Sequence, residues 1–395
     1  MSKLSKRAKT APSATRTARS TPAAHAAHAA LAPGHPLPIV LPAIVALLFG
    51  LLAGLWRLPW EIGVAASTAP LHGPLMVAGF LGTVIGVERA AALGRPWAWL
   101  APAATGLGAL LMLALAALPS TLPFRPEQAG AFLFVLGALG LCGIFLAVLR
   151  RQPTLFNGVM GLGALAFLAA NLALAAGKPV AAAVPGWNAF LLLTIAGERL
   201  ELGRVLAPKR GTGPLFVALS LVALAGAFAA PFALRGADRL LGFAMLVFGL
   251  WLATNDVARR TVRLGGVTRY TAICLLTGYV WLVIAGFSYL AKPGEMVGPS
   301  FDATLHAFAV GFVLSMIFGH APIILPALTG KAVHFGGRFY LPLALLHASL
   351  LMRIAGDHAG ALAVRRWGGL LNELALLLFA VVLIAALRRG ARRSA

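Results

Sequence analysis

The stretch "DATLHAFAVGFVLSMIFGHAPIILPALTG", from Asp302 to Gly330, decides the fold class. Apart from Asp302, His306 and His320 it carries no ionisable residue, and about 20 apolar residues are enough to cross a bilayer as a helix. Similar runs recur through the 395-residue chain, which is 60% apolar and 11% charged. Soluble domains are about 45–50% apolar and about 25% charged. The composition therefore predicts an all-α polytopic membrane protein.

Apolar windows predict twelve transmembrane helices, which together form a membrane domain over residues 36–390. The predicted spans are 38–56, 71–92, 97–118, 128–149, 154–176, 184–205, 214–234, 239–255, 268–291, 302–327, 338–355 and 367–388. Residues 1–35 contain Lys, Arg, Ala, Thr, Ser and Pro without an apolar run. This composition predicts a disordered basic tail.

The basic residues between the spans predict the orientation. Roughly three quarters of the 33 Lys and Arg residues fall on one side of the membrane when the tail is placed in the cytoplasm, where such residues are in excess. We therefore expect both termini to lie in the cytoplasm, with the chain in a bacterial cytoplasmic membrane. The net charge of +22 is distributed between spans. The expected partner is the lipid bilayer, and nucleic acid is not expected.

Two stretches of the chain resemble each other. They are "GTVIGVERAAALGRPWAWLAP" (Gly82–Pro102) and "LTIAGERLELGRVLAP" (Leu193–Pro208). A fainter copy, "SMIFGHAPIILP", places His320 where the other two have Glu88 and Glu198. We interpret these as three four-helix pseudo-repeats, at about 36–151, 153–260 and 268–390, because internal repeats are frequent in membrane proteins. The alternative is a chance match among interfacial arginines.

Histidines inside apolar spans are candidates for function, since ionisable groups are costly there. His72 begins the second span and His306 begins the tenth, from the same side. His320 lies 14 residues beyond His306, which is roughly 21 Å deeper along a helix, so the two cannot share one metal. Two imidazoles that face each other across a helix bundle suit a haem iron. The alternative is that each histidine hydrogen-bonds a backbone carbonyl.

Four glycines are expected to leave room for a flat macrocycle: Gly73, Gly79, Gly82 and Gly311. His320 and His347 are candidates for a second metal such as copper. Met76, one turn from His72, is a candidate soft ligand or a core residue. Glu88 and Glu198 are each followed by an arginine. We expect each glutamate either to pair with an arginine of another helix or to conduct protons. Glu373 and Asn171 are further intramembrane polar residues without an evident partner.

Twelve spans in three units of four, with histidines on spans two and ten, resemble the catalytic subunit of haem–copper oxidases. More closely, "DATLHAFAVGFVLSMIFGHAPIILPALTGK" (Asp302–Lys331) and the downstream "RFYLPLALLHASLLMRIAGD" resemble the NnrS family. Bacteria use these haem- and copper-containing membrane proteins during nitric oxide stress and denitrification. The resemblance implies haem b held by His72 and His306, with His320 and His347 as weaker candidates for copper. It also implies nitric oxide or another small gas as a partner.

The chain departs from both families. The oxidases bind copper through a histidine on span six and a His-His pair after span seven, and this chain has neither. An oxygen reductase is therefore not expected. After span ten the chain reads "LTGKAVHFGGR", where the His-Thr-Gly-Arg ending of the NnrS family is absent. This leaves the copper assignment open.

The leading hypothesis is a haem-binding inner-membrane protein, with copper as a further candidate, linked to nitric oxide tolerance or denitrification. Catalytic turnover and the redox partner stay open. One rival is a secondary transporter that uses Glu88 and Glu198, although such transporters usually consist of inverted repeats. The other rival is a membrane assembly factor without a cofactor.

Overall fold

The computed structural model describes residues 37–60, 66–118, 125–203, 211–234, 236–294, 297–329 and 333–394. All regular elements within these ranges are helical, and twelve of the helices found there are long and apolar enough to cross a membrane. The predicted fold class is thereby confirmed. The predicted basic tail (1–35) lies outside the described residues.

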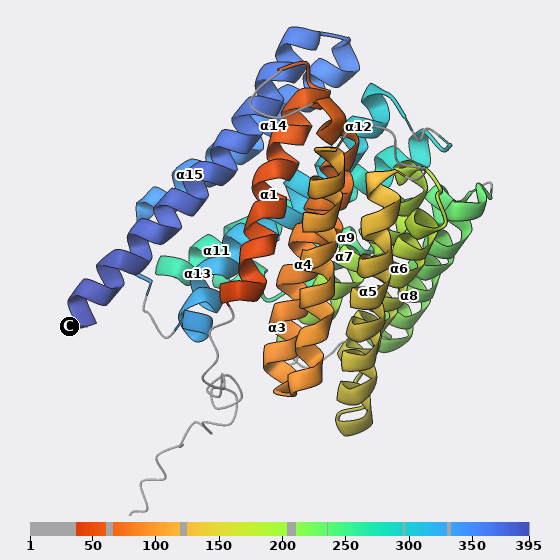
Figure 1. Ribbon diagram of the computed structural model, residues 1–395. Helices are drawn as coiled ribbons and strands as arrows, with labels where there is room; N and C mark the ends of the chain where they lie inside the picture. Colours follow the sequence, from red (N-terminus) through yellow and green to blue (C-terminus); the bar gives the residue numbers. More distant parts are fainter. Residues whose placement is uncertain are drawn as a thin grey trace, which may run out of the picture.

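The chain order of the longer helices gives the twelve spans (Figure 1). They are α1 (Leu37–Arg57), α2 to α3 (His72–Leu93, with the preceding turn η3, Ala66–Leu71), α4 (Leu100–Ala116, after η5, Pro96–Trp99), α5 (Pro126–Arg151), α6 (Leu155–Ala175), α7 (Val180–Leu202), α8 (Thr212–Ala229, continued by η7, Ala230–Phe232), α9 (Ala237–Asn255), α11 (Gly266–Ala291), α12 to α13 (Pro299–Thr329), α14 (Tyr340–Ala359, after η9, Gly337–Phe339) and α15 (Leu362–Ser394). A short helix, α10 (Ala258–Thr261), connects α9 to α11.

These bounds agree with the predicted spans to within a few residues, with two larger differences. The second span begins at Ala66, because the turn η3 extends it before His72. The last helix runs to Ser394, six residues past the predicted end of that span at residue 388. In Figure 1 the first and last described residues lie at the same end of the bundle, as an even number of spans requires. Which side of the membrane that end occupies stays a prediction.

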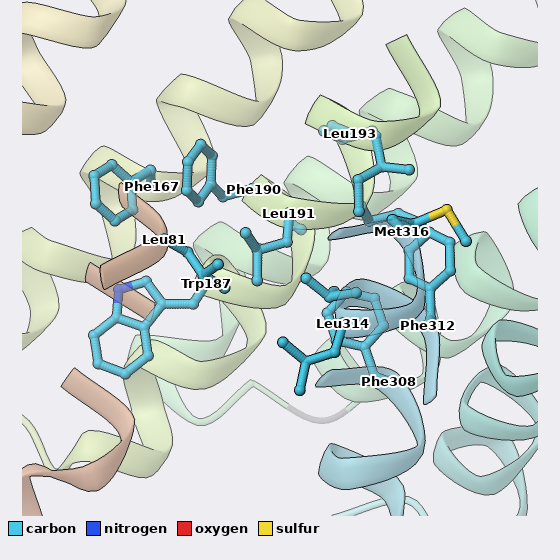
Figure 2. Close-up of a cluster of buried hydrophobic side chains, with 14 of the residues drawn as sticks. Leu81, Phe167, Trp187, Phe190, Leu191, Leu193, Phe308, Phe312, Leu314 and Met316 are labelled. Carbon is cyan, nitrogen blue, oxygen red and sulfur yellow. The ribbon is translucent and has the colours of Figure 1, made fainter. Parts of the chain in front are cut away.

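Helix α7 is the most enclosed of the spans. About 78% of its apolar window is buried, against 33–67% for the others. Glycines allow this close packing: a Cβ at Gly186 would lie 2.8 Å from the Ala170 side chain, and one at Gly197 would lie 2.5 Å from Met160. Small residues bring membrane helices together in this way. Figure 2 shows Leu191 of α7 between Leu81 of the second span and Phe167 of α6 on one side, and side chains of the tenth span such as Leu314 on the other.

The second and tenth spans share an unusual backbone feature. Each changes into a π-helical segment directly after its histidine: η4 (Leu75–Gly82) follows α2, which begins at His72, and η8 (Ala307–Leu314) follows α12, which ends at His306. Segments of this kind are rare and are frequent at functional sites. Among the described residues, the two spans with π-helical segments are therefore the two that carry the predicted ligands His72 and His306.

Candidate functional site

The predicted proximity of His72 and His306 is confirmed. Their ring centroids are 6.2 Å apart and their ring planes are within 19° of parallel. Each Nδ1 donates to a backbone carbonyl at 2.7 Å, His72 to Gly50 and His306 to Asp302. A neutral imidazole that donates through Nδ1 keeps an unprotonated Nε2 with a free lone pair. The carbonyl bonds expected under the alternative are therefore present, and because they use Nδ1 they leave each Nε2 free, so haem ligation stays a prediction.

A glycine on α1 makes the position of His72 possible. A Cβ at Gly54 would lie 2.9 Å from both Nδ1 and Cε1 of His72, closer than side chains tolerate. The same point is 3.4 Å from an oxygen of Glu373, on α15. The imidazole of His72 and the carboxylate of Glu373 therefore both lie close to the part of α1 at Gly54, which has no side chain.

A cavity of about 490 Å³ lies beside both histidines. This volume is in the range of about 300–1,000 Å³ that is usual for sites of small ligands. Its lining is mostly apolar and includes Val184, Trp187 and Leu191 of α7. The second, sixth and tenth spans all contribute, together with α1 and α15. These three spans are the second helices of the predicted repeats, although the repeat itself stays a prediction.

One buried carboxylate ties the tenth span to its neighbours at this cavity. Asp302 accepts from Arg353 of α14 at 2.8 Å and lies 3.3 Å from a terminal nitrogen of Arg365 on α15. Arg365 in turn contacts Asp357 at 2.7 Å. Arg57, at the end of α1, lines the same cavity. The cavity is thus apolar inside, with arginines at the end where the histidine-bearing spans begin.

A protein-family model matches most of the chain. A family model described as a domain of unknown function, DUF8744, matches residues 36–388. The chain belongs to the DUF8744 family. No curated protein matches the sequence. The matched region includes eleven of the twelve spans in full, most of the last one and every residue of the cavity.

Only one of the four glycines expected to make room for a macrocycle does so in this DUF8744 protein. Gly73 lines the cavity. The expectation is wrong for the other three, because side chains fill the space beside them. A Cβ would lie 2.8 Å from Ala109 at Gly79, 2.8 Å from Phe167 at Gly82 and 2.4 Å from Trp281 at Gly311. These glycines serve helix packing.

The candidates for a second metal have separate protein partners. His320 donates from Nδ1 to the carbonyl of Met316 at 2.7 Å, and its Nε2 lies 3.4 Å from Arg199. His347 accepts at Nδ1 from the indole of Trp281 at 3.0 Å. Within the described ranges, no three His, Cys, Asp or Glu side chains form a metal-type group. Copper at His320 and His347 stays a prediction.

Met76 lines the cavity of the DUF8744 chain, and its sulfur packs against α1 beside Gly50. The two candidate glutamates lie at the opposite end of the bundle. Arg89 is bonded to Glu198 and lies 3.3 Å from an oxygen of Glu88. The interpretation of Glu198 as the partner of an arginine on another helix is thereby confirmed.

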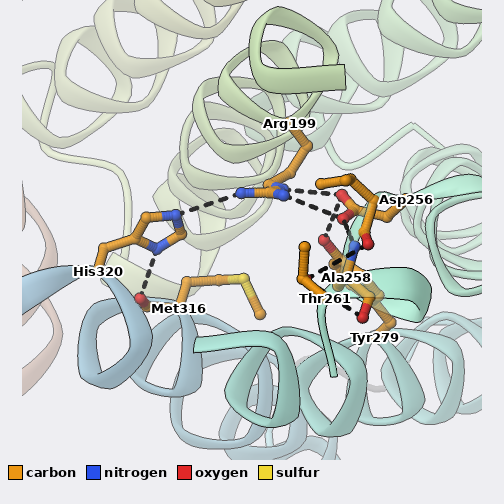
Figure 3. A network of polar contacts seen from close by, with 8 residues as sticks. Arg199, Asp256, Ala258, Thr261, Tyr279, Met316 and His320 are labelled. Carbon is orange, nitrogen blue, oxygen red and sulfur yellow. Dashed lines mark hydrogen bonds and ion pairs between the residues drawn. The ribbon is translucent and has the colours of Figure 1, made fainter. Parts of the chain in front are cut away.

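The neighbouring Arg199 forms a second buried junction at that end (Figure 3). Its guanidinium donates to both oxygens of Asp256, at 2.8 and 3.0 Å. The hydroxyl of Tyr279 donates to the same carboxylate at 2.9 Å. Together with His320 these contacts join α7 to the end of α9, to α11 and to α13. The network satisfies its own charges, and it is a structural junction.

Sequence reasoning missed four residues of the site, namely Trp187, Asp302, Arg353 and Arg365. Asp302 had a readable signal, because it lies four residues before His306 and so on the same helix face. The two arginines fall in and after predicted span eleven, where they could be read only as loop and interface charges. Trp187 is one apolar residue among many, and nothing local distinguishes it.

Proposed function

We propose that this DUF8744 protein binds haem b in the membrane, with His72 and His306 as the two axial ligands. The separation of the imidazoles carries the proposal. Metal–imidazole bonds are about 2 Å long and a ring centre lies about 1 Å beyond the bonded nitrogen, so two axial imidazoles have centres about 6 Å apart. The centroids of His72 and His306 are 6.2 Å apart. Rings packed directly on each other would be closer.

The lining of the cavity also supports this proposal. Its walls are mostly apolar, as a porphyrin requires. Haem b carries two carboxylates, and arginine is the side chain best suited to bind them. Arg57, Arg353 and Arg365 all line the cavity.

The chain's own residues would do three things here. His72 and His306 hold the iron, their carbonyl partners Gly50 and Asp302 fix the tautomer of each ring, and α7 closes the cavity. When held by two histidines, haem supplies a one-electron carrier. The resemblance of Asp302–Asp357 to the NnrS family supports a role in nitric oxide tolerance. This role is tested by growth of a deletion strain under a nitric oxide donor, with the wild-type gene and His306→Ala as complements.

A reduced-minus-oxidised spectrum of the purified full-length protein tests haem binding. We expect about one haem b per chain in the wild type, and its loss in His72→Ala and in His306→Ala. His358→Ala is the matched control, because His358 is exposed at the end of α14. A colourless wild type purified from haem-replete cells would contradict the proposal. So would full haem content in both ligand variants.

Glu88 and Glu198, the residues of the transporter hypothesis, are both close to Arg89, and this hypothesis stays the alternative. A colourless protein that takes up a solute with protons would nevertheless support it. A colourless protein without transport activity would support the hypothesis of a membrane assembly factor without a cofactor. Metal analysis of the purified protein decides the copper prediction, with His320→Ala and His347→Ala as the test variants.

A further inference from the structure

We infer that Asp302 is a positioning residue that fixes the His306 ring and lowers the reduction potential of the haem, an inference that rests on the function proposed above. The two candidate ligands differ at Nδ1. His72 donates to the carbonyl of Gly50, and no carboxylate of the described residues lies within ion-pair distance of its ring. His306 donates to the carbonyl of Asp302, and the carboxylate of the same residue lies 3.5 Å away.

The carboxylate of Asp302 is held in place from two other helices. Arg353 contacts it through Nη2 at 2.8 Å and through Nε at 3.3 Å. Arg365 lies at 3.3 Å and is itself bound to Asp357. The side chains of Asp302 and His306 are only 13% and 12% exposed. The negative charge is therefore fixed next to the ring and is poorly screened by solvent.

A fixed carboxylate beside the Nδ1–H of a ligating imidazole orients the ring and raises its basicity. A more basic ligand and a nearby negative charge both stabilise ferric iron. Asp302→Asn removes the charge and also leaves Arg353 without its counter-ion and Arg365 with Asp357 alone. Both consequences favour the ferrous state, so they shift the reduction potential in the same, positive direction.

The test is a potentiometric titration of the haem absorbance in full-length protein, with redox mediators as one-electron donors. For Asp302→Asn we expect at least a tenfold rise in the ferrous-to-ferric ratio at a given potential, which is about 59 mV for a one-electron couple. Asp357→Asn is the matched control, because it removes a carboxylate of the same cluster that does not contact His306. We expect a clearly smaller shift for it.

Arg353→Gln gives a second measurement with the opposite sign. It removes a cation from Asp302 and keeps the carboxylate, so the potential should fall. If the Asp302→Asn protein does not accumulate, the reduction potential of Arg353→Gln alone tests the inference. An Asp302→Asn protein with the wild-type potential, or an Arg353→Gln protein whose potential rises, would overturn the inference. A wild type without haem would instead overturn the proposed function, so the two failures are distinguishable.

Discussion

At the scale of single residues, Gly54 is the position on which the orientation of His72 depends most. A methyl group there would lie 2.9 Å from the imidazole. We expect Gly54→Ala to displace the ring and to weaken haem binding about 10-fold or more, as losses of supporting contacts do at metal sites. Haem titration of the purified variant measures this effect.

Gly158→Ala is the control for that substitution. Gly158 lies near the start of α6, and a Cβ added there meets no atom within 4 Å. Its haem affinity should equal that of the wild type. Equal affinities of the two alanine variants would contradict the role assigned to Gly54.

The pairing of His72 and His306 was readable from the sequence, because both residues begin spans that enter the membrane from one side. The partners at Nδ1 were not readable, since Gly50 contributes only its backbone. The glycines illustrate the limit most clearly. A glycine in a membrane helix admits either a ligand or a neighbouring helix, and the sequence of one helix does not tell which.

At the scale of helices, the junction of Arg199 and Asp256 is expected to stabilise the fold. Arg199→Ala leaves the Asp256 carboxylate, 2% exposed, without its bidentate partner. Removing one member of a buried ion pair costs about 3–5 kcal/mol. We therefore expect a large loss of thermal stability in detergent, measured by the remaining monodisperse fraction after heating.

Arg259→Ala serves as the matched arginine control. Arg259 is exposed, and its guanidinium donates to the backbone carbonyl of Thr254, five residues earlier in the chain. Its removal should leave the stability unchanged. An Arg199→Ala protein as stable as this control would show that the junction does not hold α7 in place.

The two arginine contacts form a pattern across the predicted repeats. Arg89 bonds Glu198, and Arg199 in turn approaches His320, the residue at the equivalent place of the faint third copy. The predicted repeat relates Glu88, Glu198 and His320 to one another, whereas nothing in the sequence indicates the π-helical segments. Hydropathy windows locate a span, but they do not reveal a local change in helical register.

At the scale of the whole molecule, the twelve spans followed from composition and apolar length alone. Orientation is the remaining prediction. We expect a reporter fused after residue 395 to lie in the cytoplasm, and one inserted at 293–294, between the ninth and tenth spans, to lie outside. A fluorescent protein and alkaline phosphatase distinguish the two sides, and exchanged signals would contradict the predicted orientation.

The central position of α7 could not be predicted from the sequence, because every span is apolar and lipid-facing and buried faces look alike. The cavity depends on this arrangement, since it brings the second, sixth and tenth spans together. Titration of haem into detergent-solubilised protein freed of pigment tests the central claim most directly. Saturation at one haem per chain in the wild type, with none bound by the double variant His72→Ala/His306→Ala, is the predicted result. Equal binding by the wild type and the double variant would contradict it.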